Sequence, residues 1–313
     1  MEYNKAMFEY EEISQCPLCQ SNQYYDLYVA TDRLGRTESQ FKFVQCNECG
    51  LVFQNPRVNP KTIGVFYPDS YYQNRKINNR KNTIKANIVK NNVSLRGSLI
   101  EVGSASGDFL NKMKKMGWYV EGVEPSYEGV QHCKNHYKIN SIHCGNLLSR
   151  HDNGIRFDVA VLWGVLPHIH NPVQTIHYLS EILKPSGKII VTCANIDSIP
   201  AKIMKDRWGH LDLPRHYFMW SPSTLRKLLE MNNLNFNKII FHDNLWNSNV
   251  NLFKLKPLSF FNDHLFSNQH LDKAHKYILQ RSNRLLSHPL LILSRLLKKG
   301  GMMTAVGTKV KLA

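Results

Sequence analysis

Short apolar runs and amphipathic segments alternate through the second half of the chain. Near-continuous apolar runs, which are typical of strands buried on both faces, predict strands over 98–102, 119–123, 156–163, 188–194 and 236–241. The segments between them place apolar residues at helical spacing and predict helices over 108–116, 127–137, 172–183 and 224–231. Strands that alternate with helices indicate an α/β fold with a doubly wound parallel sheet, whose ligands lie at the carboxyl ends of the strands.

The first part of the chain has a different pattern. Strand-like runs over 24–30 and 40–45 flank a turn at 32–35, and the Lys/Asn-rich segment 73–96 is expected to be a linker and surface helix. These changes predict three parts along the chain. They are a small β module over 1–60, a linker or helical segment over 61–97, and the α/β domain over 98–313 with a helical insertion at about 250–300.

Composition narrows the class of protein. The 313 residues are 42% hydrophobic and 20% charged, with a mean hydropathy of −0.37. These values exclude collagenous, disordered and polytopic membrane proteins. The sequence has no run of about 18 uncharged apolar residues, and its first residues lack the apolar run of a signal peptide. The expected location is therefore cytoplasmic.

Charge leaves two interpretations open. Forty Lys and Arg residues against 24 Asp and Glu residues give a net charge of +16. Such a balance favours anionic partners, nucleic acid or lipid head groups among them. A general bias toward Lys, Asn and Ile, strongest in segment 73–96, produces the same excess without any ligand.

Two Cys-x-x-Cys pairs near the N-terminus indicate a metal site. Cys16 and Cys19 form the first pair, Cys46 and Cys49 the second, and 26 residues separate them. Two residues between the sulfurs allow both to face one ion, and Gly50 permits the sharp turn that follows. The alternative is a redox Cys-x-x-Cys motif, which normally occurs once, at the start of a helix. The pattern favours a closed four-thiolate zinc site with a structural role.

A loop of small residues follows the first strand of the α/β domain. It runs from Glu101 through Gly103 to Gly107, and small residues there allow a ligand to approach the backbone. Glu124 ends the second strand, 23 residues after Glu101, where a doubly wound nucleotide site places a carboxylate for ribose hydroxyls. The dinucleotide pattern G-x-G-x-x-G is absent, which favours a nucleoside cofactor without phosphates.

At this point the chain resembles the class I S-adenosylmethionine-dependent methyltransferases. EVGSASG resembles their acidic-x-Gly-x-Gly-x-Gly loop, with Ala105 in place of the middle glycine. FDVAVLWGVLPHIHNP resembles the fourth strand and its loop, and LKPSGKIIVTCAN the fifth. CNECGLVFQNPR and PRHYFMWSPSTLRKLL resemble segments of a subgroup that methylates sugars, antibiotics or other secondary metabolites. The resemblance implies a Rossmann-like seven-stranded sheet after the small zinc-binding module, with a final strand over 302–310 paired antiparallel between the fifth and sixth.

The resemblance also implies which residues bind S-adenosylmethionine. Glu124 would hold the ribose, Asn146 and Leu147 would surround adenine, and Trp163 and Gly164 would flank the methionine part. The full expected set is Glu101, Gly103, Ser104, Ala105, Gly107, Glu124, Pro125, Asn146, Leu147, Trp163 and Gly164.

One departure from the family concerns catalysis. Its Val-Leu-Glu-His sequence is VLPH here, so the carboxylate is lost and His168 remains. Methyl transfer requires a base to remove the proton of the acceptor, and histidine suits that role near neutral pH. His216 is the first expectation because the resemblance places the PRH segment over the active site, with Arg215 binding an anionic group of the substrate. His168 is the second expectation, and both histidines have the structural alternative of an ordinary hydrogen-bonded side chain.

Three functions remain open from the sequence. The leading prediction is a methyltransferase for a small-molecule acceptor: a sugar, a polysaccharide precursor or a secondary metabolite. The zinc module and the net charge of +16 favour an RNA methyltransferase as the alternative, although no arginine and aromatic stripe for base stacking is evident. A catalytically inactive cofactor-binding module is the third, because of the lost carboxylate.

The segment 284–299 has a separate pattern. Leu286, Leu290, Leu293 and Leu297 form one helical stripe beside basic residues, and Pro289 is expected to start the helix. A basic amphipathic helix of this kind predicts peripheral contact with an anionic membrane. The alternative is a helix that packs its stripe on the core or on a second copy.

Overall fold

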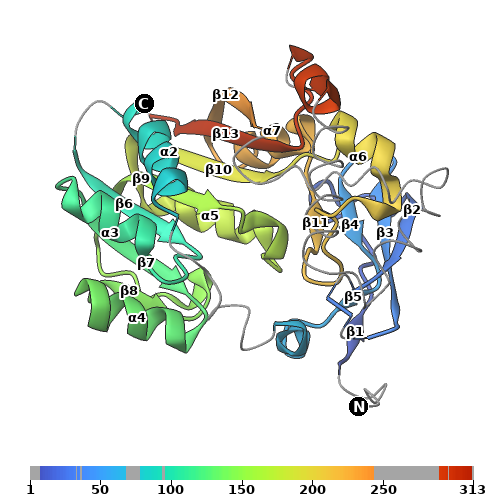
Figure 1. Cartoon of the computed structure of the whole chain (residues 1–313), viewed down its shortest axis with the longest axis horizontal. Helices are drawn as coiled ribbons and strands as arrows, with labels where there is room; N and C mark the ends of the chain where they lie inside the picture. Colours follow the sequence, from blue (N-terminus) through green and yellow to red (C-terminus); the bar gives the residue numbers. More distant parts are fainter. Residues whose placement is uncertain are drawn as a thin grey trace, which may run out of the picture.

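The computed structural model describes residues 8–32, 34–35, 37–67, 78–93, 96–242, 289–294 and 296–311. Two sheets meet in this part of the chain, a large one at the left of Figure 1 and a smaller one at the right. None of the helices described there has the length and apolar character needed to cross a membrane.

The large sheet has the predicted seven strands. Its order is β12-β13-β10-β9-β6-β7-β8. The strands are β6 (Ser98–Val102), β7 (Tyr119–Glu124), β8 (Ile142–Cys144), β9 (Phe157–Trp163), β10 (Leu183–Ala194), β12 (Leu234–His242) and β13 (Met302–Lys309). β13 pairs antiparallel with both β10 and β12, so the expected place of the final strand is confirmed.

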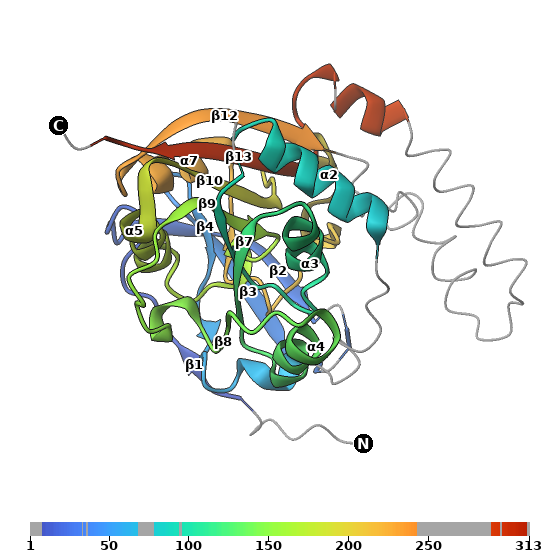
Figure 2. The same cartoon turned by 90° about the vertical axis from the view of Figure 1, so that its left-hand side faces the viewer.

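Helices cover both faces of this sheet. α2 (Asn79–Lys90) and α3 (Asp108–Lys115) lie side by side on one face, and α5 (Pro172–Ile182) and α7 (Pro222–Glu230) cover the other (Figures 1 and 2). Alternate residues of the central strands enter different cores: Val159 and Val161 face α3, while Ala160 and Leu162 face α5. Because both faces are buried, the strands are apolar throughout, which explains the pattern of the sequence. α4 (Tyr127–Tyr137) follows β7, and α6 (Ile199–Met204) follows β10.

The smaller sheet contains strands from two of the predicted parts of the chain, 1–60 and 98–313. Its order is β11-β4-β3-β2, from β2 (Tyr24–Thr31), β3 (Gln40–Cys46), β4 (Val52–Gln54) and β11 (Phe218–Met219). β11 lies more than 160 residues beyond β4 and pairs antiparallel with it. Two short strands, β1 (Tyr10–Glu11) and β5 (Arg57–Val58), pair beside this sheet. The predicted boundary at residue 60 therefore ends the Cys-containing segment, but a shared sheet crosses it.

The core is shared in the same way. Cys16, Leu18 and Leu51 of the N-terminal segment belong to the same buried cluster as α5, α7 and the large sheet. A second cluster packs Phe41, Phe43 and other residues of the small sheet against α6 and the segment that follows it. Burial of apolar side chains, as in these two clusters, contributes most of the stability of a folded domain. The N-terminal segment is thus packed on the α/β domain over a broad apolar surface.

The helical segment near the C-terminus differs from the predicted stripe. Residues 289–294 and 296 are helical, consistent with a start at Pro289. Leu290 and Leu291 pack on the core, whereas Leu293 and Leu297 are about half exposed. The predicted stripe is therefore not the packed face. Leu286, the basic residues Arg284 and Arg295, and most of the predicted insertion lie outside the described residues.

Candidate functional site

A large cavity of about 1470 Å³ opens at the carboxyl ends of the parallel strands. Its lining comes from the loops after β6, β7, β8, β9 and β10. Segments η1 (Ile63–Phe66), η3 (Leu166–His168) and 209–217 contribute to the wall as well, and one side of α2 completes it. The cavity thus lies where a doubly wound sheet is expected to bind its ligand.

The loop after β6 is shaped by residues that no larger side chain can replace. Gly103 has φ +71°, and a Cβ there would lie 2.4 Å from Val165 Cγ2. Gly107 has φ +80°, and a Cβ there would lie 2.5 Å from Cys133 Sγ. Ala105 adopts φ +51°, a left-handed conformation that explains why the related families use glycine at this position. The loop keeps the close turn that the sequence predicts, at the cost of some backbone strain.

Glu124 holds this loop to the end of β7. Its Oε2 accepts a hydrogen bond from Ala105 N at 2.7 Å, and its Oε1 accepts one from Ser126 N at 2.9 Å. The side chain is 3% exposed and lines the cavity. A carboxylate fixed by backbone donors on two neighbouring loops is preorganised at the rim of the cavity, as the prediction for a ribose-binding acid requires.

Glu101 and Ser104 supply polar atoms without partners among the described residues. Glu101 Oε2 and Ser104 Oγ are buried, and neither has a hydrogen-bond partner in that part of the chain. Burial raises the pKa of Glu101 to about 8, and the nearby Lys85 acts in the opposite direction. Buried polar atoms are normally paired. Their position in the wall of the cavity fits a polar ligand that would pair them, such as S-adenosylmethionine.

The remaining expected cofactor residues also line the cavity. Pro125, Asn146 and Leu147 lie at the β7 and β8 side, and Trp163 and Gly164 lie at the end of β9. Asn146 caps η2 (Leu147–Ser149) by accepting a hydrogen bond from Ser149 N at 2.9 Å. The structure therefore brings the predicted cofactor residues together around one cavity, except Gly107, which packs against Cys133 and is not part of the cavity wall. Their contacts with a cofactor stay a prediction.

Two histidines form a pair in the opposite wall. The rings of His168 and His216 lie 4.4 Å apart between centroids, in an edge-to-face arrangement. His216 Nδ1 lies 2.8 Å from the carbonyl oxygen of His210, which only accepts, so Nδ1 carries the proton and Nε2 holds the lone pair. Burial and the charge of His168 lower the pKa of His216 to about 3. His216 is therefore neutral across the physiological range.

His168 is positioned from two directions. Its Nδ1 lies 3.0 Å from the carbonyl oxygen of Arg215 and 3.1 Å from the hydroxyl of Tyr67. Tyr67 belongs to the predicted linker segment 61–97, so this wall of the cavity joins that segment to the α/β domain. Tyr71 and Tyr72 of the same tyrosine-rich stretch lie outside the described residues.

The structure contradicts the role expected for Arg215. Its side chain is fully buried and is not part of the cavity wall. Nη1 donates to Asp32 Oδ1 at 2.9 Å, and Nη2 donates to Asp212 Oδ1 at 2.9 Å. With both faces of the guanidinium paired to carboxylates of this chain, no donor faces an anionic substrate. Arg215 instead links the N-terminal segment to the loop that carries His216.

Asp212 is a site residue that the sequence did not reveal. It lines the cavity, and burial alone would raise its pKa, but the protonated form of His216 and the hydrogen-bonded Arg215 guanidinium hold that pKa well below its usual range. Asn195, which follows β10, is structural, because its amide donates to the carbonyl oxygen of Gly300 at 3.0 Å and is fully buried. His170 contacts Glu11 and Arg57 of the N-terminal segment.

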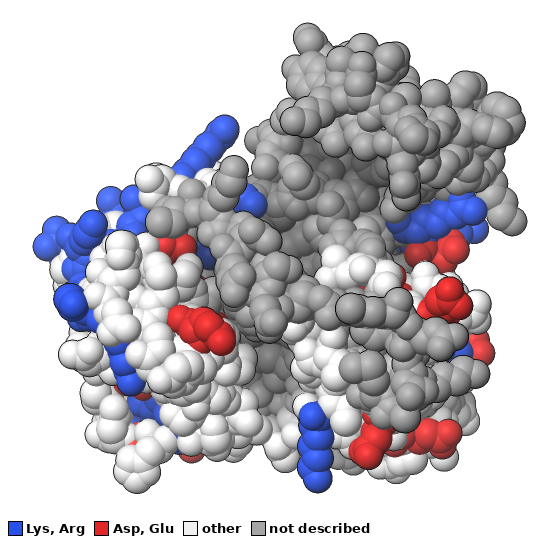
Figure 3. All heavy atoms as spheres, turned by 60° about the horizontal axis from the view of Figure 1, so that its bottom comes forward, with Lys and Arg blue, Asp and Glu red and all other residues white. Residues whose placement is uncertain are grey.

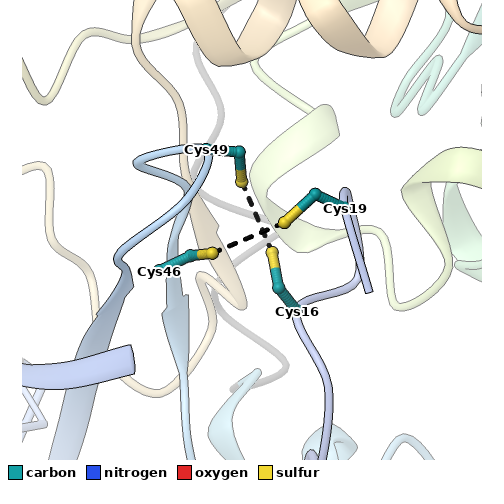
Figure 4. Close-up of side chains that lie close together, drawn as sticks. All are labelled: Cys16, Cys19, Cys46 and Cys49. Atoms are coloured by element: carbon teal, nitrogen blue, oxygen red, sulfur yellow. Dashed lines mark hydrogen bonds between the residues drawn. The ribbon is translucent and has the colours of Figure 1, made fainter. Parts of the chain in front are cut away.

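The four predicted metal ligands converge at one point. Figure 4 shows Cys16 and Cys19 on one turn facing Cys46 and Cys49 on the other. The sulfurs of Cys16 and Cys49 lie 3.5 Å apart, as do those of Cys19 and Cys46, and all four lie within 4.8 Å of one another. Sulfurs of a tetrahedral zinc centre lie about 3.8 Å apart, given Zn–S bonds of about 2.3 Å. This cluster has the dimensions and donors to bind a metal ion.

Comparison with known proteins agrees with this architecture. A family model described as a methyltransferase domain matches residues 75–238, more than half of the chain. The chain belongs to this methyltransferase family. With the cavity and its glycine loop, membership identifies it as an S-adenosylmethionine-dependent methyltransferase.

The curated relatives of this methyltransferase share little sequence identity with it. An enzyme named ubiquinone biosynthesis O-methyltransferase from Coxiella burnetii is 24% identical over 119 residues, covering 36% of this chain and 51% of the relative. Its mitochondrial namesake from Rattus norvegicus is 22% identical over 151 residues, covering 44% of each chain. The methyltransferase thus spans about half the length of the curated relatives it matches.

The solved structures that resemble this chain also share little sequence identity with it. A putative sarcosine dimethylglycine methyltransferase from Galdieria sulphuraria is 13% identical, with a TM-score of 0.49 over 78% of this chain and 91% of that one. The plantazolicin methyltransferase BpumL in complex with SAH is 15% identical, with a TM-score of 0.47 over 81% of this chain and 91% of that one.

Proposed function

We propose that this methyltransferase acts on a small-molecule acceptor, a sugar, polysaccharide precursor or secondary metabolite, with a histidine as the base. The observation that carries the proposal is the pair of imidazoles in the cavity wall, with His216 held by the His210 carbonyl so that its Nε2 lone pair is available. The Coxiella burnetii relative, named as an O-methyltransferase of ubiquinone biosynthesis, supports a small acceptor as well.

The chain's own residues provide for proton removal. S-adenosylmethionine, when bound, supplies a methyl group already activated on a sulfonium. His216 Nε2 would accept the proton of the acceptor hydroxyl. Its lowered pKa keeps it unprotonated before the reaction but makes it a weak base, so the charged form needs the nearby Asp212 carboxylate, which acts to raise that pKa. The Asp212 carboxylate in the same wall would offset the charge that His216 gains. Asp212 is in turn held in place by Arg215, which makes Arg215 a positioning residue.

The lost family carboxylate is consistent with this assignment. Pro167 stands where the related proteins have Glu, and its carbonyl oxygen accepts a hydrogen bond from Tyr217 N at 2.8 Å. The position thus serves to anchor the segment that carries His216. We infer that His216 replaces the missing carboxylate as the base, which argues against a catalytically inactive module.

Surface charge favours the small acceptor over RNA. On the face shown in Figure 3, the described Lys and Arg side chains gather mainly toward one margin, and most of the described surface beyond it is neutral or acidic. Binding of a nucleic acid backbone depends on many clustered basic contacts. On this face the described basic side chains do not spread over the surface as an extended track for a nucleic acid backbone.

A labelling experiment tests this function. The protein is incubated with methyl-labelled S-adenosylmethionine and either a polar metabolite extract or total RNA, with the His216→Ala protein as the matched control. We expect label in the metabolite pool that the control does not transfer. Label in RNA would replace the proposal by the RNA alternative, and cofactor binding without any transfer would leave the inactive module.

We propose that the Cys16, Cys19, Cys46 and Cys49 cluster binds one structural zinc ion. Four thiolates close the coordination sphere, so no position is left for a substrate. Metal analysis of protein purified without chelator should find about one equivalent of zinc, because folding and binding are coupled. Cys46→Ser should release it and lower the melting temperature, whereas substitution of the exposed Cys144 by Ser should do neither. Metal-free native protein would overturn the assignment.

A further inference from the structure

Helix α2 presents a polar stripe to the cavity. Asn78 at its N-cap and Lys81, Asn82 and Lys85 in its first two turns all line the cavity, at the spacing i, i+3, i+4 and i+7 of one helical face. Further along the helix, Ala86 and Val89 pack into the core shared with α3. This anchoring fixes α2 beside the loop that follows β6, and it makes a Lys/Asn-rich segment part of the binding site.

Lys85 holds a defined place within this stripe. Its Nζ lies 5.5 Å from the ring centroid of Phe109 and 5.5 Å from that of Trp163. These two rings pack edge to face at 5.4 Å between centroids and lie at the start of α3 and the end of β9. An ammonium over aromatic faces is held by cation–π attraction in a partly desolvated setting, where a further charge contact is stronger than in water.

The position of the adenosine end of the cofactor fixes the neighbours of its amino-acid end. Glu124 and Asn146 lie on the β7 and β8 side of the cavity, and Trp163 and Glu101 lie on the β9 and β6 side. If the ribose binds at Glu124, as proposed for S-adenosylmethionine, the amino-acid end extends toward Trp163. That end carries an α-ammonium and an α-carboxylate. Buried Glu101, with its unpaired Oε2, suits the ammonium, and the carboxylate requires a cation.

We propose that Lys85 binds the α-carboxylate of the cofactor and so completes the site at its amino-acid end. This inference rests on S-adenosylmethionine as the cofactor. In the described part of the chain, Lys85 is the lysine placed over both the Trp163 and Phe109 rings at this end of the cavity. Lys85 and Glu101 would then hold the two charges of the amino-acid end.

The test compares two ligands that differ in the amino-acid end. S-adenosylhomocysteine carries the α-carboxylate, and 5′-methylthioadenosine lacks the whole amino-acid group. Calorimetry should show that Lys85→Met weakens S-adenosylhomocysteine by roughly 10- to 100-fold, the size expected for loss of a charged hydrogen bond. The same substitution should leave 5′-methylthioadenosine unchanged. Lys85→Arg should restore most of the affinity, and Lys90→Met, an exposed lysine of the same helix, is the matched control.

Each outcome has a separate meaning. Equal weakening of both ligands, or a loss of melting temperature in Lys85→Met, would show that Lys85 only supports the fold and would overturn the proposal. Unchanged S-adenosylhomocysteine binding in Lys85→Met, with normal binding by the unaltered protein, would overturn this proposal alone. Failure of the unaltered protein to bind either ligand would overturn the cofactor assignment, and this proposal with it.

Discussion

The proposed cofactor half and the proposed acceptor half of the cavity differ in how far apart in the sequence their residues lie. Glu101, the glycine loop and Glu124 belong to one strand-helix-strand unit, and backbone hydrogen bonds within that unit hold them together. The acceptor half joins Tyr67, His168 and His216 from three separate segments. The loop and Glu124 in the first half are held by contacts within one unit, whereas the second half exists only when segments far apart in the chain pack together. Changes in the two halves should therefore separate cofactor binding from catalysis.

The largest expected separation is at His216. His216→Ala should lower kcat by about 10²- to 10⁴-fold, because removal of a general base has that effect. The dissociation constant of S-adenosylhomocysteine should stay the same, because His216 lies in the acceptor wall. Stopped assays with labelled cofactor and calorimetry on the same preparation measure both quantities. Near-normal turnover would move the role of base to His168.

Glu124 should show the opposite behaviour. Glu124→Ala removes a carboxylate that holds Ala105 N and Ser126 N, and it should weaken cofactor binding by about 1.5–3 kcal/mol. Glu124→Gln keeps one acceptor oxygen and should lose less. Calorimetric titration of both variants checks this expectation, and unchanged affinity in Glu124→Ala would remove Glu124 from the site.

A smaller effect concerns the protonation state of Glu101 in the cofactor half. Since the pKa of Glu101 is raised to about 8, the folded protein keeps a proton that the unfolded chain releases near pH 4.5. Stability is therefore fully present at low pH and is lost as pH rises toward 8. Between pH 6.5 and 8, where His216 contributes equally to both proteins, wild type should lose about 2 kcal/mol more than Glu101→Gln.

Urea unfolding of the two cofactor-free proteins at these two pH values measures the difference. A parallel loss of stability in both proteins would show that Glu101 is ionised in the folded state. Addition of S-adenosylhomocysteine should reduce the slope for wild type, since a cation beside Glu101 favours its charged form.

The smallest expected effect lies outside both halves. Ile292, Leu293, Leu296 and Leu297 are 48%, 48%, 75% and 56% exposed, and Lys298 and Lys299 follow them. The predicted contact with an anionic membrane remains a prediction, and flotation with anionic vesicles at low salt tests it. Weak flotation that Leu296→Ser and Leu297→Ser abolish would support it. Absence of flotation would leave a protein partner as the occupant of this face.

The same contrast explains what the sequence could and could not predict. The strands and helices of the large sheet follow from local periodicity, and the glycine loop and Glu124 follow from small residues and spacing. β11 escaped prediction because a two-residue strand has no periodicity, and its partner lies far away in the chain. The role of Arg215 was wrong because its partners Asp32 and Asp212 become neighbours only through folding. Lys85 lay in a segment whose composition resembled a linker.

The pairing of β11 with β4 also means that β4 is synthesised long before its partner strand. A ribosome adds about 5–20 residues per second, so β4 waits roughly ten to thirty seconds before residues 218–219 leave the tunnel and cover it. During that time the edge of β4 presents unpaired backbone groups, as any open sheet edge does. A nascent chain halted between these strands should be vulnerable to self-association and should depend on chaperones. In the folded protein, β11 from a distant part of the sequence pairs with β4 and covers this edge.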